Sequence, residues 1–293
     1  MQTDFYSPAV RETIPAGWRE AVLSANGVRQ HTFQVERPAS RLEGWVVLLH
    51  GYMSLGLAWL ETARALAADF DLLLPDARGH GASEIDAAGY SVDLVAADTL
   101  ALVQSLGLRR PALVGHSNGA LAAFALAAAH PAFASRVVLV DPPMPRERQL
   151  DTSAPGFQAW RRAWAAWMEA LKGMDPEQQA ASFLAQQMPG APVLNGTRLA
   201  LAVEAAVRLD LSLIRDPDPI YPALDPALVD RVTCPVLLVT GDPARGGMLV
   251  PQVVERLLSS PRVVHVPIPG AGHFVAEDQP ERFHAVLREF LAA

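Results

Sequence analysis

The chain has 293 residues, which is enough for one large α/β domain with an inserted lobe or for two modest domains. Hydrophobic residues make up 51% of the sequence and charged residues 19%, a globular composition that excludes a disordered chain. The formal net charge of -7 provides no basic surface, so we expect neither nucleic acid nor an anionic membrane as a partner.

Cys234 is the only cysteine, which excludes an intramolecular disulfide and leaves a cysteine-histidine metal site without support. The first residues lack the basic and apolar segments of a secretory signal, and no apolar run reaches the length of a membrane span. We therefore expect a cytoplasmic protein that acts on a small molecule and needs neither a metal ion nor a cofactor. The sequence leaves a homo-oligomer open.

The first regular element should be a β-hairpin. Apolar stretches at residues 21–23 and 28–35 flank Asn26-Gly27. Asparagine and glycine both accept the positive φ that a two-residue hairpin turn requires.

Six short and nearly continuous apolar runs follow, a pattern typical of strands that are buried on both faces of a parallel sheet. They span residues 45–49, 70–74, 112–114, 137–140, 236–239 and 263–266. Helical patterns lie between most of them, at residues 59–68, 93–106, 121–129 and 251–258. This alternation predicts an α/β fold with a doubly wound, mostly parallel sheet.

The alternation stops at residues 142–231, where no clear strand pattern is present. Asp175 precedes a proline and is placed as the N-cap of a helix, and a further amphipathic helix is predicted over residues 197–214. We expect this region to form a helical cap, inserted into a core made of residues 1–141 and 232–293.

Three tryptophans give the predicted cap an apolar stripe. Trp160, Trp164 and Trp167 fall on one face of a helical pattern together with Leu171. Such a stripe more often packs on the core than binds a ligand, but a lid over an active site also needs an apolar underside. Trp160 and Trp164 are therefore our candidates for contact with a substrate.

The strongest chemical signal is the sequence Gly-His-Ser-Asn-Gly at residues 115–119, between a predicted strand and a predicted helix. A tight turn from strand to helix leaves no room for side chains at the two glycine positions and strains the central residue. The turn should raise the Ser117 hydroxyl into solvent at the helix N-terminus, where free backbone N–H groups favour negative charge. Ser117 is therefore the candidate nucleophile.

A serine nucleophile needs a base and a group that stabilises the oxyanion. His273 lies in the glycine-rich loop Pro269-Gly270-Ala271-Gly272 after the last predicted strand, from which its ring can reach the edge of the sheet. His50-Gly51-Tyr52 follows the first strand of the parallel sheet. The backbone N–H groups of Tyr52 and Asn118 are placed to converge on a developing negative charge.

These motifs, in this order and spacing, resemble those of the α/β-hydrolase superfamily over residues 45–140 and 232–291. The matching pieces are His50-Gly51-Tyr52 with Trp59, the block from Asp76 to Ser83, residues 115–119 and residues 270–273. The resemblance implies the Ser117 nucleophile, the His273 base, the donors of Tyr52 and Asn118, and an inserted cap. It also implies that Arg78 and His80 have structural roles.

The acid that would orient His273 is the point at which the sequence departs from the family pattern. The family usually places it after the penultimate strand, where Asp242 is the only carboxylate of its loop but follows Gly241 immediately. Some members take the acid from the end of the preceding strand, which here is Asp141. We favour Asp242 and keep Asp141 as the alternative.

The predicted function is hydrolysis of an ester or lactone of small or medium size and apolar character, through an acyl-enzyme. The same residues would also serve a carbon–carbon bond hydrolase or a cofactor-free perhydrolase. A small-molecule receptor on the same scaffold is the alternative that involves no catalysis, although a receptor has no need of the nucleophile, base and oxyanion donors.

Overall fold

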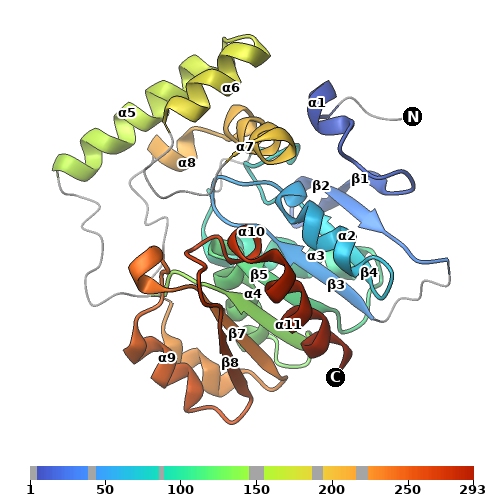
Figure 1. Cartoon of the computed structure of the whole chain (residues 1–293). Helices are drawn as coiled ribbons and strands as arrows, with labels where there is room; N and C mark the ends of the chain where they lie inside the picture. Colours follow the sequence, from blue (N-terminus) through green and yellow to red (C-terminus); the bar gives the residue numbers. More distant parts are fainter. Residues whose placement is uncertain (1–4, 39–43, 86–88, 145–154, 187–193, 216–223) are drawn as a thin grey trace.

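The computed structural model describes residues 5–38, 44–85, 89–144, 155–186, 194–215 and 224–293, and its strands form one eight-stranded sheet (Figure 1). The strands are β1 (Arg19–Ala25), β2 (Val28–Val35), β3 (Trp45–Leu49), β4 (Asp71–Pro75), β5 (Ala112–His116), β6 (Arg136–Val140), β7 (Val236–Thr240) and β8 (Val263–Pro267). Their order in the sheet is β1-β2-β4-β3-β5-β6-β7-β8.

Helices lie on both faces of this sheet and above one of its ends (Figure 1). The α-helices are α1 (Pro8–Arg11), α2 (Leu60–Leu66), α3 (Val92–Ser105), α4 (Asn118–Ala129), α5 (Pro155–Lys172), α6 (Pro176–Ala185), α7 (Gly196–Arg208), α8 (Ser212–Arg215), α9 (Pro251–Leu258), α10 (Val275–Asp278) and α11 (Pro280–Ala292). The short 3-10 helices are η1 (Gly56–Trp59), η2 (Pro226–Arg231) and η3 (Pro243–Arg245).

The sheet is mostly parallel, as the sequence predicts. The two antiparallel pairs are those that β2 forms with its neighbours β1 and β4. The hairpin between β1 and β2 turns at Asn26 and Gly27, whose φ angles are 52° and 80°, in agreement with the expected two-residue turn. The expected strands are confirmed, and their ends differ from the prediction by two residues or fewer.

Burial on both faces explains why the strands read as continuous apolar runs. Along β3, Val47 and Leu49 join the cluster that contains Phe124 of α4. The alternate residues of β3, with Val46 among them, join the cluster on the other face, which contains Phe283 of α11. A strand with both faces covered has no position for a polar side chain.

The helices α5 to α8 lie together above the end of the sheet, in the part of the chain predicted to form a cap (Figure 1). Met168 and Leu171 of α5 pack with Leu209 and Ile214 in a hydrophobic cluster of their own. Asp175 caps α6 as expected, because its side chain accepts a hydrogen bond from the N–H of Gln178.

The helix predicted over residues 197–214 is wrong in one respect, because α7 ends at Arg208 and α8 begins at Ser212. The break is held by Asp210, whose N–H donates to Gly79 O at 2.9 Å. Its carboxylate accepts from the N–H of Ser212 at 3.1 Å, which competes with continuation of the helix. A contact with a distant loop therefore decides the local structure here.

The end of the predicted cap lies against the core. The 3-10 helix η2 packs on α4 and α9, and its Val229 belongs to the main core cluster. No helix within the described residues is long and apolar enough to cross a bilayer. The described part of the chain also contains no group of three or more acidic, histidine or cysteine side chains that could hold a metal ion.

Candidate active site

Ser117 lies at the sharp turn between β5 and α4 with φ 53° and ψ -120°, a strained conformation for a residue with a side chain. A Cβ at Gly115 would lie 2.3 Å from Gly119 O, and a Cβ at Gly119 would lie 2.3 Å from Leu49 O. Both glycines are thus required by close backbone approach, as the motif predicts.

The side chain of Ser117 is less accessible than expected, because the residue is only 5% exposed. The loop next to it explains this burial. A Cβ at Gly51 would lie 3.2 Å from Ser117 Cβ, and the following residues Tyr52 and Met53 pack against the hydrophobic cluster of the cap. Ser117 is therefore more buried than the prediction of a solvent-exposed hydroxyl requires, and the loop beside it contacts helices α5 to α8.

The His273 ring is brought to the same edge of the sheet by the loop after β8. Its Nδ1 lies 2.7 Å from Asp141 Oδ2, and its side chain is 19% exposed. An ionised carboxylate only accepts hydrogen bonds, so Nδ1 donates and Nε2 carries the free lone pair. This is the tautomer that a general base needs.

Asp141 is fully buried and directly follows β6. Its backbone has φ 43°, and its carboxylate accepts hydrogen bonds from Met248 N at 2.8 Å and Gly241 N at 3.4 Å. These backbone donors, together with His273, orient the buried carboxylate and satisfy its hydrogen-bonding capacity.

Asp242, the acid we favour from the sequence, does not occupy this position. It is exposed, and its side chain accepts from Ala244 N at 2.8 Å, where it caps the 3-10 helix η3. The structure pairs His273 with Asp141, so the preference for Asp242 is corrected. Asp242 follows Gly241 so closely that its side chain serves the local turn, while the loop backbone donates to Asp141.

A signal for Asp141 is present in the sequence. The carboxyl ends of neighbouring parallel strands meet at one edge of a sheet. Asp141 follows β6, and Ser117 follows β5, which is the adjacent strand. The adjacency of these two strands, which the chain order suggests, places the two residues together.

His116 connects Ser117 to the loop that carries His273. Its Nε2 donates to His273 O at 2.9 Å, and the two ring centroids are 4.7 Å apart. Burial, with the electrostatic effect of the neighbouring His273 ring, lowers the pKa of His116 to about 3, so this ring is neutral. Within the described residues no hydrogen bond joins the Ser117 hydroxyl to the His273 ring, and His116, the neighbour of Ser117 in the chain, contacts His273.

The loop that carries Tyr52 is held by two further neutral histidines. His50 Nδ1 donates to Gly51 O at 2.8 Å, while its Nε2 accepts from Ala77 N at 2.9 Å. The Nε2 of His80 accepts from Met53 N at 3.3 Å. Burial lowers the pKa of His50, and burial together with the electrostatic effect of the His50 ring lowers the pKa of His80 to about 3.

Tyr52 and Asn118 are placed on the same edge of the sheet as Ser117. Asn118 is the first residue of α4, so its N–H has no partner within the helix. Tyr52 follows Gly51, which lies against Ser117. Their roles as oxyanion donors remain a prediction.

The block from Asp76 to Ser83 forms a rigid support behind the site. Arg78 is 1% exposed and makes two hydrogen bonds of 2.6 Å to the carboxylate of Asp98. Asp76 is fully buried and accepts from Gly56 N at 2.7 Å and from Ala82 N at 2.9 Å. Burial opposes its charge, but hydrogen bonds from His31 and other donors outweigh burial and hold the pKa of Asp76 well below its usual range.

The two cap tryptophans differ in their surroundings. Trp160 is 50% exposed, and its ring stacks on Trp164 at a centroid distance of 5.9 Å. Trp164 packs against the hydrophobic cluster of the cap, which Tyr52 also contacts. Contact of either tryptophan with a substrate remains a prediction.

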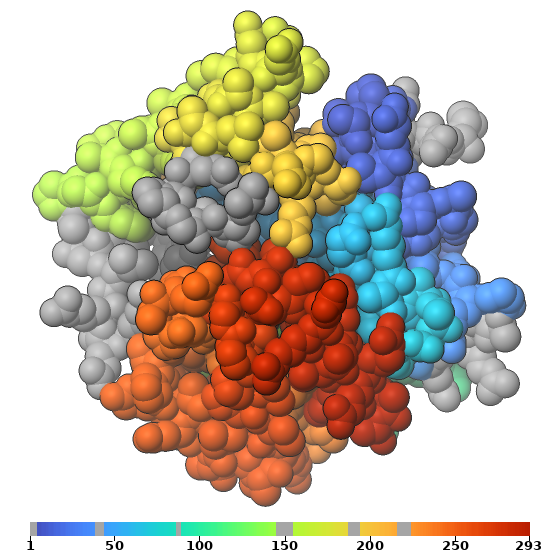
Figure 2. Space-filling model, in the orientation of Figure 1, coloured from blue at the N-terminus to red at the C-terminus, as the bar shows by residue number. Residues whose placement is uncertain are grey.

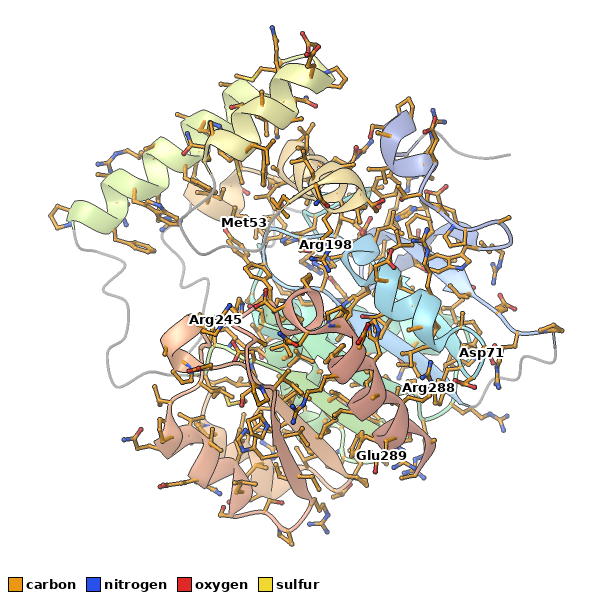
Figure 3. All side chains as sticks on the ribbon, in the orientation of Figure 1. Met53, Asp71, Arg198, Arg245, Arg288 and Glu289 are labelled. Carbon is orange, nitrogen blue, oxygen red and sulfur yellow. The ribbon has the colours of Figure 1, made fainter. Side chains whose placement is uncertain are left out.

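Cap and core also meet on the other side of the site. Arg198 of α7 donates to the backbone oxygen of Glu277 in α10 at 3.0 Å. The atoms of α7 touch the C-terminal segment in Figure 2, and Figure 3 places Arg198 and Met53 between the cap helices and the core.

The sequence profile of the alpha/beta hydrolase family matches residues 46–286, and the chain belongs to this family. It is 29% identical over 278 residues to the N-formylmaleamate deformylase of Pseudomonas putida, covering 92% of this chain and 95% of that protein. It is also 29% identical over 269 residues to the putative carbamate hydrolase RutD of Klebsiella pneumoniae, covering 85% of this chain and 91% of that protein.

A solved structure of similar fold is the carboxylesterase CesB of Bacillus subtilis. Its TM-score is 0.75 at 20% identity, and the match covers 97% of this chain and 95% of that one. At this identity the likeness concerns the fold alone.

Proposed function

We propose that this chain hydrolyses a carboxylic ester or lactone of small or medium size through Ser117, His273 and Asp141. The observation that carries the proposal is the 2.7 Å contact between His273 Nδ1 and the buried carboxylate of Asp141, at the edge where Ser117 occupies its strained turn. A histidine so oriented presents Nε2 as a base, and a strained serine at a helix N-terminus is the usual partner of such a base.

The reaction would follow acyl transfer. His273 takes the proton of Ser117 while the hydroxyl oxygen attacks the carbonyl carbon, and the negative charge moves to the carbonyl oxygen. The backbone N–H groups of Tyr52 and Asn118 would stabilise that oxyanion. His273 then gives its proton to the leaving group, and water repeats the sequence to release the acid. Asp141 would stabilise the protonated His273 without taking its proton.

A second candidate reaction is hydrolysis of a carbon–nitrogen acyl bond. It is favoured by the two relatives named as a deformylase and a putative carbamate hydrolase, each 29% identical to this chain over most of its length. The same residues would serve this reaction, because a formamide, a carbamate and an ester all react at a carbonyl carbon.

The test combines labelling with kinetics. A fluorophosphonate should modify the parent protein at Ser117, as found by mass spectrometry of the peptide, and p-nitrophenyl acetate should be hydrolysed. Ser117→Ala should lose labelling and at least about a thousandfold of kcat, since it removes the nucleophile.

A panel of an ester, a lactone, an N-formyl amide and a carbamate then separates the two candidate reactions through their kcat/KM values. Hydrolysis that persists unchanged in Ser117→Ala would refute the proposal. Binding of these compounds without any turnover would also contradict it and would favour a receptor.

A further inference from the structure

Arg161 of helix α5 is a buried cation whose terminal nitrogens make no hydrogen bond, and its guanidinium carbon lies 6.0 Å from the centroid of the Phe157 ring. The residue is 2% exposed. Its Nε donates to the backbone oxygen of Ile214 at 2.5 Å, but neither terminal guanidinium nitrogen makes a hydrogen bond. No carboxylate of the described residues lies within 4.0 Å of this guanidinium. Burial of an unpaired charge is costly, so the absence of an anionic partner among the described residues needs an explanation.

Trp164 of the same helix adds a third donor without a hydrogen bond. It lies one turn along α5 from Arg161, on the same face of the helix. Its indole Nε1 is buried and likewise makes no hydrogen bond. Two guanidinium nitrogens and one indole nitrogen thus have no acceptor among the described residues, whereas native interiors satisfy nearly all such groups.

These donors lie on the side of the cap that contacts the candidate active site. Arg161 binds the backbone of Ile214, and the preceding residue Leu213 accepts a hydrogen bond from the Tyr52 hydroxyl at 2.8 Å. Tyr52 in turn follows Gly51, which lies against Ser117. Met53, from the same loop, lies beneath the cap helices (Figure 3) and packs in the cluster that includes Trp164.

We propose that Arg161, assisted by the indole of Trp164, binds a carboxylate of the substrate, so that the preferred substrates are anionic. The planar guanidinium matches the two oxygens of a carboxylate, and one positive charge balances one negative charge. This inference rests on the proposed function and names the substrate class of the same site.

The side chain of Tyr52 separates the Arg161 end of the site from the Ser117 end. The substrate carboxylate must therefore be joined to the reacting carbonyl by a spacer. The expected substrates are therefore half-esters or related monoacyl derivatives of dicarboxylic acids. Their apolar spacer would lie along Tyr52 and the hydrophobic cluster of the cap.

The kinetic test uses mono-p-nitrophenyl esters of glutaric and suberic acids, with p-nitrophenyl pentanoate and octanoate as neutral partners of equal length. We expect the parent to prefer the anionic esters. In Arg161→Met the ratio of kcat/KM for anionic over neutral esters should fall by roughly tenfold to a hundredfold, mainly through KM, because charge-assisted hydrogen bonds are lost. Trp164→Phe should lower the ratio by a smaller factor.

The matched control is Arg162→Met, which removes an exposed arginine from the next position of the same helix and should leave the ratio unchanged. A binding test without turnover uses Ser117→Ala and follows its melting temperature with suberate and octanoate. Suberate should raise the melting temperature of Ser117→Ala but not of the double variant with Arg161→Met. Arg161→Lys in the Ser117→Ala background keeps the positive charge but loses the planar guanidinium with its two parallel donors. It should bind suberate more weakly than Ser117→Ala alone.

The outcomes separate this inference from the proposed function. Efficient hydrolysis of neutral esters with no preference for anionic ones would overturn the carboxylate site and leave the hydrolase proposal standing. An equal fall of the ratio in Arg161→Met and Arg162→Met would show a general effect of charge and would also refute it. If Arg161→Met fails to fold, Arg161→Lys and the suberate titration of Ser117→Ala still decide the question.

Discussion

At the scale of single residues, Asp141 differs from Asp242 in burial and in partners. Asp141 has no exposure and accepts from His273 and from the backbone of the loop after β7. Asp242 is exposed and accepts only a local backbone hydrogen bond in the described contacts of its side chain. A buried carboxylate interacts more strongly with an imidazolium than an exposed one does, because water screens the latter.

We predict that Asp141→Asn lowers kcat for p-nitrophenyl acetate by roughly 10³ to 10⁴, since an amide can hold the wrong tautomer of His273 and does not stabilise its charge. Asp242→Asn should change kcat by less than a factor of about three, as an exposed capping asparagine replaces an aspartate well. Steady-state kinetics of both variants provides the measurement. A larger loss in Asp242→Asn than in Asp141→Asn would refute the role of Asp141 as the acid that orients His273.

At the scale of secondary-structure elements, the site depends on how closely α4 approaches β3. The helix begins immediately after Ser117, and Gly119 in its first turn lies against the backbone of Leu49 and His50. This contact fixes the N-terminus of the helix next to the loop that carries Tyr52. A side chain at this position would move the two elements apart.

Gly119→Ala should therefore destabilise the fold by about 1–3 kcal/mol and lower kcat as well, because its Cβ would lie 2.3 Å from Leu49 O. Gly156→Ala is the control, since a Cβ at Gly156 in the first turn of α5 meets nothing within 4 Å. It should be neutral or stabilise by up to about 1 kcal/mol. Urea denaturation with parallel kinetics measures both effects, and equal stabilities of the two variants would contradict the argument.

At the scale of the whole molecule, buried histidines should make stability depend on pH in opposite senses. The pKa values of His80 and His116 are both lowered to about 3, chiefly by burial. A group whose pKa is lower in the folded state than in the unfolded state stabilises the fold above the unfolded value of 6.5 and loses that contribution as pH falls. His31 has the opposite shift, because hydrogen bonds from its ring to Asp76 and Glu20 outweigh burial and raise its pKa to about 9.

We expect the free energy of unfolding to fall between pH 6.5 and pH 4, by up to about 1.4 kcal/mol per pH unit for each histidine that stays neutral in the fold. On the alkaline side, the contribution of His31 is complete below pH 6.5 and is lost as pH rises to about 9. His31→Gln should thus be less stable than the parent at pH 6, and the difference should shrink towards pH 9. Urea denaturation at several pH values measures this, and a difference independent of pH would refute the assignment.

Local patterns in the sequence were sufficient for much of the fold. The apolar runs predict strands such as β3 and β7 because burial on both faces favours apolar side chains along most of a strand. The turn at Asn26-Gly27, the glycines around Ser117 and the N-cap at Asp175 are also set by backbone geometry within a few residues. Such features depend on neighbours in the chain, so the chain alone contains the necessary information.

Packing between distant segments decided the remaining points. It placed the carboxylate of Asp141 rather than that of Asp242 at the His273 ring, interrupted the helix at Asp210, and buried Ser117 beside the loop of Gly51. It also buried the terminal nitrogens of Arg161 without a hydrogen-bond acceptor among the described residues, which nothing in its local sequence indicates. In each case the outcome depends on which of two distant groups comes within hydrogen-bond distance, and short-range propensities carry no information about such distances.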